Sequence, residues 1–257
     1  MRAIPDIGAD AIALARRLAA LEEGTVRARA AARALEALGP DRAALVIASL
    51  VERGGTDGAT AAVAAVGQAF LDPGSGLSYQ WRSELYVSAR EIGLPEVAAL
   101  LLSPPPHRAW EEPRDKADPR LAHLSLGQKK TLARVRRDPD LLARLAAEGE
   151  PAVVRELLRN PLLTEPFAVR IASRRPIRPE TLRCIFEERR WRTRTSVRLA
   201  LARNPYVDTG IALLILPTLP ARELADIAED GALHAEVRAQ AGRIAEGRGA
   251  RRPGVAG

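Results

Sequence analysis

The second half of the chain contains short stretches in which apolar residues recur at every third or fourth position. The first three stretches are Val154, Leu157 and Leu158; Val169, Ile171 and Ala172; and Leu182, Ile185 and Phe186. This spacing places the apolar side chains on one face of an α-helix. Helices of about ten residues are too short to be stable alone in water, so we expect each to be held by its neighbours.

The first hundred residues show the same helical periodicity in an alanine-rich sequence. Glycines such as Gly24, Gly39, Gly54 and Gly93 follow these stretches, as is typical of helix C-termini. Aromatic residues make up only 4% of the chain and hydrophobic residues 47%, which favours closely packed helices over a β-sandwich. We therefore predict an all-α fold. The helices expected here span 9–21, 25–38, 41–53, 59–71, 79–92 and 95–102.

A motif repeats in the second half of the chain. Val154-Arg155 followed by Asn160-Pro161 recurs 43 to 44 positions later as Val197-Arg198 followed by Asn204-Pro205. Asn-Pro is a stop signal, because asparagine tolerates a left-handed backbone and proline cannot continue a helix. Further helices are expected to open at Thr164 and Asp208 and at Pro139, Pro179 and Pro220, and a terminal helix at 236–246. The unit is therefore three short helices in roughly 40 to 44 residues.

This pattern resembles that of bacterial HEAT-like or armadillo-like α-solenoids, including the leucine-rich-repeat-variant type, over about residues 124–246. The resemblance implies a right-handed α-solenoid in the second half and a role as a scaffold or binding surface. It implies no cofactor, because the iron-sulfur segment of one leucine-rich-repeat-variant protein needs clustered cysteines and Cys184 is alone.

Breaks in composition divide the sequence into four parts. Residues 1–102 form an α-helical region, which we expect to hold degenerate repeats, with a separate bundle as the alternative. Residues 103–120 combine Pro104-Pro105-Pro106 with charge and read as an extended linker, on which Trp110 docks against a flanking region or remains free. The repeat region spans 121–247 and a disordered tail spans 248–257.

Positive charge is concentrated after residue 120. Residues 1–120 carry 14 basic and 16 acidic side chains, whereas the remainder carries 25 basic and 16 acidic ones. Arginine is densest between Arg170 and Arg203. The candidate binding surface consists of Arg174, Arg175, Arg178, Arg189, Arg190, Trp191, Arg192 and Arg194.

Two interpretations of this arginine-rich segment remain open. In the first, the arginines track a phosphate backbone and Trp191 stacks on an unpaired base, which makes the chain a nucleic-acid-binding protein. In the second, the arginines coat solvated helix faces and cap helix ends while Trp191 fills a gap between repeats. The second interpretation favours a non-enzymatic scaffold for another protein, with the arginine-rich middle preferring an acidic segment.

No catalytic or metal-binding constellation is evident in the sequence. The three histidines, His107, His123 and His234, have no neighbouring ligands at metal-binding spacing, and Cys184 lies within an apolar helical pattern. An enzyme similar to HEAT-like DNA glycosylases remains an alternative, without a residue-specific match. Charged residues near the N-terminus argue against a signal peptide, and a single cysteine suits the cytoplasm, so we expect a cytoplasmic protein without membrane insertion.

Overall fold

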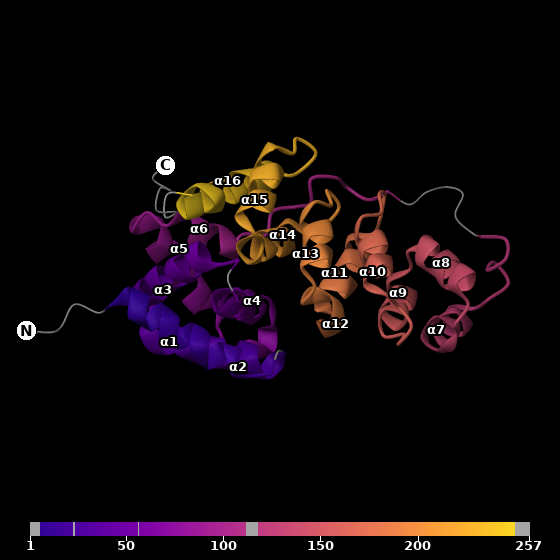
Figure 1. Ribbon diagram of the computed structural model, residues 1–257, viewed down its shortest axis with the longest axis horizontal. Helices are drawn as coiled ribbons and strands as arrows, with labels where there is room; N and C mark the ends of the chain where they lie inside the picture. The colour runs from indigo at the N-terminus through magenta and orange to yellow at the C-terminus, as the bar shows by residue number, and fades with distance from the viewer. Residues whose placement is uncertain (1–5, 23, 56, 112–117, 250–257) are drawn as a thin grey trace, which may run out of the picture. The chain divides into compact units, whose positions relative to one another are not determined.

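The computed structural model describes residues 6–22, 24–55, 57–111 and 118–249 (Figure 1). Within these ranges the chain forms sixteen α-helices and three short 3-10 helices, and it contains no strand. The all-α prediction is therefore confirmed. None of the described helices has the length and apolar character needed to cross a membrane.

The chain divides into two compact units. Unit 1 consists of Met1–Pro104 together with Ala212–Gly257, and unit 2 consists of Pro105–Ile211. This division differs from the boundaries expected from sequence, because the last helices of the expected repeat region pack with the N-terminal helices instead.

Unit 1 is built on helices of 13 to 15 residues at its N-terminal end. Asp6 caps the first helix by accepting a hydrogen bond from the backbone N–H of Ala9, and Ser78 caps α5 through the N–H of Trp81. Helix α3 buries seven residues and packs on α1, α4 and α5. The helices are α1 (Ile7–Ala19), α2 (Thr25–Leu38), α3 (Pro40–Arg53), α4 (Asp57–Leu71), α5 (Tyr79–Glu91), α6 (Pro95–Ala98), α15 (Ala221–Glu229) and α16 (Ala235–Gly249).

Helix α16 belongs to unit 1 through buried polar contacts. Its Gln240 donates to the backbone carbonyl of Glu96 at 2.7 Å, and its Arg248 donates to the carbonyls of Val51, Pro217 and Leu219 at 2.6 to 2.8 Å. Arg248 was expected in a disordered tail, and this prediction is wrong because the residue is helical and its guanidinium satisfies three carbonyls. Residues 250–257 of that tail lie outside the described ranges.

Glycine is required where α16 approaches α3. A side chain at Gly54 would collide with the Pro217 carbonyl and the Arg248 guanidinium, so only a residue without Cβ allows this approach.

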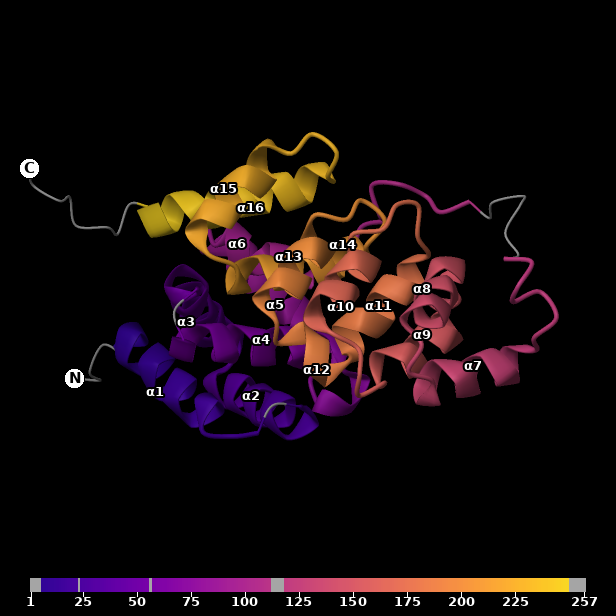
Figure 2. The same ribbon diagram turned by 45° about the vertical axis from the view of Figure 1, so that its right-hand side comes forward.

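Unit 2 is built from shorter helices. Helix α9 contacts α7 and α11, and α10 contacts α13. These helices therefore pack on neighbours that lie a few helices earlier or later in the sequence. Figures 1 and 2 show these helices following one another in chain order, from α7 to α13. The helices are α7 (Leu126–Val135), α8 (Pro139–Glu148), α9 (Pro151–Leu158), α10 (Glu165–Ala172), α11 (Pro179–Glu187), α12 (Arg189–Arg192) and α13 (Thr195–Ala202), and α14 (Thr209–Ile215) leads out of the unit.

The segment expected to be a linker lies partly against unit 2. The Arg108 N–H donates to the Pro205 carbonyl at 3.0 Å, and the Thr209 hydroxyl donates to the Pro105 carbonyl at 2.9 Å. Unit 2 therefore begins and ends at neighbouring points, as expected for a module inserted in another chain segment. Trp110 is docked, since the Arg178 guanidinium lies 4.6 Å from its ring centroid. Residues 112–117 of the linker lie outside the described ranges.

Candidate functional site

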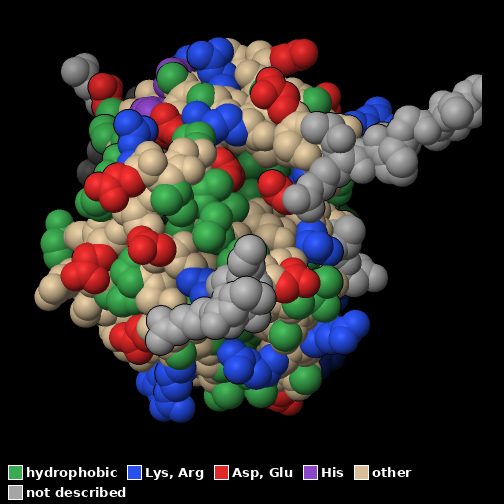
Figure 3. Space-filling model, turned by 90° about the vertical axis from the view of Figure 1, so that its left-hand side faces the viewer, with side chains coloured by type: hydrophobic (Ala, Val, Ile, Leu, Met, Phe, Trp, Pro, Cys, Tyr) green, Lys and Arg blue, Asp and Glu red, His purple; other side chains and the backbone are tan. Residues whose placement is uncertain are grey.

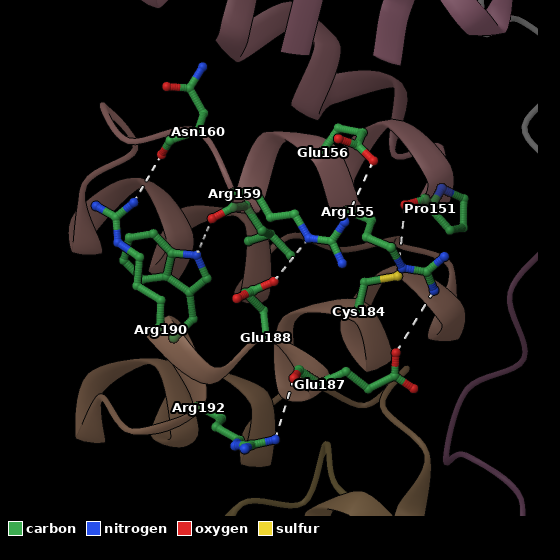
Figure 4. Close-up of polar contacts among 12 residues, drawn as sticks. Pro151, Arg155, Glu156, Arg159, Asn160, Cys184, Glu187, Glu188, Arg190 and Arg192 are labelled. Atoms are coloured by element: carbon green, nitrogen blue, oxygen red, sulfur yellow. Dashed lines mark hydrogen bonds and ion pairs between the residues drawn. The ribbon is translucent and has the colours of Figure 1, made fainter. Parts of the chain in front are cut away.

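The eight residues of the predicted binding surface all lie in unit 2, between the end of α10 and the start of α13; Figure 4 labels Arg190 and Arg192 of them. The structure brings them into a region where α11 and α12 meet α8, α9 and the loop after α9. Five of the eight residues are exposed, Arg178 and Arg192 are half-buried, and Trp191 is buried.

Trp191 is an interior residue. Its side chain is 2% exposed, and its indole Nε1 donates to the Leu158 carbonyl at the end of α9 at 2.8 Å. A ring enclosed in this way is not accessible to a nucleic-acid base. The structure therefore removes Trp191 from the candidate binding surface.

Arg190 lies over the ring of Trp191 and binds the backbone of the loop after α9. Its guanidinium is 4.3 Å from the Trp191 ring centroid and donates to the carbonyls of Asn160 at 2.9 Å, Leu163 at 2.7 Å and Pro161 at 3.3 Å. These carbonyls follow a helix end and have no helical partner. Figure 4 shows the Arg190 guanidinium pointing at Asn160, so its donors serve the unit's own backbone.

The arginines before α11 are also used inside unit 2. Arg174 donates to the Ala146 carbonyl at 3.2 Å, and burial lowers the pKa of its guanidinium although much of the side chain is exposed. Arg175 donates to the Arg203 carbonyl. Arg178 stacks on Trp110 and pairs with Glu150 at 3.3 Å.

The remaining three arginines of the predicted surface extend from α12 and from the residue that precedes α13. Arg192 donates to the Glu187 carbonyl at 3.4 Å, and the Arg194 Nε lies 3.7 Å from Glu165 Oε2. Arg189 is exposed and also has an interaction partner. All eight predicted residues therefore make interactions within the protein.

Ion pairs join the helices around this region. Arg155 lies 3.8 Å from Glu187, Arg159 lies 3.5 Å from Glu188, and Arg183 lies 2.5 Å from Asp208. The three arginine side chains are 50 to 54% exposed, so each pair adds roughly 0 to 1 kcal/mol to stability. Their larger consequence is electrostatic, because Glu187, Glu188 and Asp208 place carboxylates among the more numerous arginines of α9 to α13.

Two buried asparagines hold equivalent places in the repeated motif. The Asn160 side-chain amide donates to the carbonyls of Ala133 and Arg136 at 2.9 Å, while its oxygen accepts from the Leu162 N–H at 3.0 Å. Asn204 donates to the carbonyls of Ala172 at 2.7 Å and Arg174 at 3.0 Å and accepts from the Tyr206 N–H. Each asparagine thus ties its own loop to the C-terminal end of an earlier helix.

The sequence reasoning treated Asn-Pro only as a helix stop and missed this second role. The recurrence of the same asparagine at a 44-residue spacing was the available signal, because a simple stop tolerates glycine or several polar residues.

Cys184 is buried in α11. Its side chain is 3% exposed and its Sγ lies 3.8 Å from the Pro151 carbonyl. Burial raises the pKa of the thiol, and the nearby Arg155 only partly opposes this effect. A thiol with a raised pKa is a poor nucleophile at neutral pH.

The histidines do not gather at a site. His107 and His123 are exposed, and His234 accepts a hydrogen bond from the Glu236 N–H at 3.1 Å. Within the described ranges, no group of three or more His, Cys, Asp and Glu residues is placed to hold a metal ion.

Neither a family model, nor a curated protein, nor a solved structure matches this chain.

Proposed function

We propose that this chain is a non-enzymatic scaffold that binds another protein through unit 2. One observation carries the proposal: most arginines of the 170–203 segment pair with carboxylates or carbonyls of their own unit, and Trp191 is buried. A surface that carries carboxylates among its arginines suits a protein partner, since interface charges set register and specificity. Phosphate tracking instead favours an uninterrupted row of cations.

We further propose that the repeats form an α-solenoid of the HEAT or armadillo kind. The sequential packing of α7, α9 and α11 and the equivalent bonds of Asn160 and Asn204 support it. In such a fold, stacked helical units present an extended surface to a partner.

A peptide selection tests the scaffold role. A library of random 12-residue peptides is selected against the full chain, and the enriched peptides are synthesised and titrated by calorimetry. We expect saturable 1:1 binding by a set of related peptides that carry net negative charge. If no enriched peptide binds in solution, the scaffold proposal is wrong.

The alternative function, nucleic-acid binding through the arginine-rich face around 170–203, is tested in parallel. Fluorescent single- and double-stranded oligonucleotides are titrated with the protein from about 50 to 300 mM salt, a range over which phosphate contacts weaken steeply. The scaffold proposal predicts that binding disappears by the middle of the series. Affinity that persists there and is lost in Arg189→Glu with Arg192→Glu favours the nucleic-acid function instead.

A further inference from the structure

The C-terminal end of α7 and the loop after α9 carry exposed apolar residues beside exposed arginines. Val135 is 57% exposed and Leu162 is 48% exposed. Arg134, Arg136 and Arg137 surround Val135 in the sequence and are exposed as well. We call these five residues the α7 patch.

The two apolar residues of the α7 patch come from segments that the structure holds together. The Asn160 side chain donates to the Arg136 carbonyl at 2.9 Å and accepts from the Leu162 N–H at 3.0 Å. The backbones of Arg136, which follows Val135, and of Leu162 therefore both bond to the side-chain amide of Asn160. Asn160 is itself 1% exposed and also bonds the Ala133 carbonyl, so this junction is rooted in the core of unit 2.

The arginines of the α7 patch differ from those of α10 to α13. In the part of the chain that the structure describes, the side chains of Arg134, Arg136 and Arg137 make no ion pair or hydrogen bond. The nearest carboxylates in the sequence are already engaged. Asp138 accepts from the Asp140 N–H at 3.0 Å, and Asp140 binds Arg144 at 2.8 Å.

We propose that the α7 patch binds an acidic segment of a partner protein that carries two hydrophobic side chains. The inference rests on the proposed scaffold function and names the chemistry of the partner. Three arginines without an ion-pair partner select negative charge and speed association, while Val135 and Leu162 supply apolar contact that anchors the segment. A nucleic acid would gain from the arginines but little from these two aliphatic side chains.

The test uses three fluorescein-labelled 14-residue peptides and the full-length protein. The first peptide is rich in Asp and Glu and contains two leucines, the second has serines in place of the leucines, and the third has lysines in place of the acids. A single-stranded oligonucleotide of matched charge is titrated alongside them. Anisotropy gives the affinity of each probe in moderate salt.

Two variants of the α7 patch are compared with two matched controls. The charge variant is R134Q/R136Q/R137Q, and its control is R16Q/R17Q/R33Q, which changes three exposed arginines of unit 1. The apolar variant is V135S/L162S, and its control is V26S, at a position 64% exposed in α2. All changed residues are exposed, so the fold is expected to survive, and thermal melts verify this.

We expect the acidic, leucine-containing peptide to bind best and each variant of the α7 patch to weaken it about tenfold, equivalent to about 1.4 kcal/mol. The controls leave the affinity unchanged. Equal binding by the serine peptide or the oligonucleotide, with no effect of V135S/L162S, marks general basicity and overturns the inference. Peptides that bind but ignore both variants overturn it too, while the library selection described above decides the scaffold function separately.

Discussion

Units 1 and 2 are both all-helical, but they stabilise their helices by different means. In unit 1, α1 to α4 are 13 to 15 residues long and their packed faces are rich in alanine, valine and leucine. In unit 2, α8 to α11 and α13 are only 8 to 10 residues long. A short helix leaves up to about half of its backbone groups without a helical partner, so it depends on bonds from outside.

Side chains of unit 2 supply those bonds. Asn160, Asn204, Arg174, Arg190 and Trp191 each donate to carbonyls near the end of an earlier helix or the loop that follows it. The comparison teaches that a high arginine content can serve the fold, because arginine side chains bind backbone carbonyls that short helices leave without a partner.

The two units also differ in net charge. Residues 105–211 carry 23 arginines and lysines against 14 carboxylates, whereas the rest of the chain is slightly acidic, with 16 against 18. On the face seen in Figure 3, basic, acidic and hydrophobic side chains are interspersed. The basic excess of the protein therefore belongs to unit 2, and much of it is consumed by internal contacts.

The largest effect is expected from placing a charge in the core of unit 2. Leu157 is fully buried in α9, so Leu157→Asp places an unpaired charge in the core of unit 2 and should cost about 3 to 5 kcal/mol. Cys184 is the only cysteine and is buried in α11, so its labelling by a thiol reagent reports the opening of unit 2. Labelling should accelerate strongly.

The control for this prediction is Leu162→Asp, at a position 48% exposed, which should change the labelling rate little. Leu199→Asp should fall between the two, since Leu199 is half-buried. Equal labelling rates for the wild type and Leu157→Asp would contradict the packing described for α9.

A smaller effect is expected from the asparagine that ties α9 to α7. Asn160→Ala leaves the Ala133 and Arg136 carbonyls without their donor and should cost about 2 to 4 kcal/mol. Urea unfolding measures the loss, followed by Cys184 labelling for unit 2 and by amide exchange in α16 for unit 1. The matched change in unit 1 is Gln240→Ala, which leaves only one backbone carbonyl, that of Glu96, without its donor, besides removing the bonds that the amide oxygen accepts from Arg243, and should cost less. The opposite order would break the distinction between the units.

In unit 1, Arg248 is the side chain that most resembles these carbonyl-binding residues of unit 2. Burial lowers the pKa of its guanidinium to about 10, so it remains a cation at neutral pH and is satisfied by carbonyls instead of a carboxylate. Arg248→Met should cost about 1 to 3 kcal/mol and raise amide exchange in α16. Arg243→Met, which removes the pair with Glu236 and two bonds to the Gln240 amide oxygen, serves as the control. Unchanged protection in α16 would refute this role.

The smallest expected effect concerns Glu96 of unit 1. Desolvation raises the pKa of this half-buried carboxyl, so folding disfavours its charged form. The native state then binds more protons than the unfolded state between the ordinary and the raised pKa, and stability falls as pH rises through that window. Glu96→Gln should therefore stabilise unit 1 by less than about 1 kcal/mol at neutral pH.

The gain in stability from Glu96→Gln should shrink on acidification, because the Glu96 carboxyl of the wild type is then protonated and as neutral as the glutamine that replaces it. Urea midpoints at pH 7.5 and pH 4 measure it, with the exposed Glu91→Gln as control. A gain that grows on acidification would reverse the assigned sign.

The sequence predicted most helices closely because their end signals are local. The helix expected at 25–38 was found at those bounds, Pro139 and Pro179 each lie at the first position of a helix, and Pro220 directly precedes α15. Helices α7 and α12 were not predicted. The first begins at a capping box formed by Ser125 and Gln128 but carries one fully buried residue, and the second is four residues long, so neither shows a clear apolar period.

The sequence by itself determined the helical class, the proline and glycine boundaries and the basic excess after residue 120, because these depend on neighbouring residues or on composition. Tertiary structure alone decided that α16 packs in unit 1, that Trp191 is buried and that Arg190 serves a carbonyl cluster. Those outcomes join residues about 30 to 200 positions apart. Hydrophobic burial and backbone satisfaction choose among such pairings only after the chain has closed on itself.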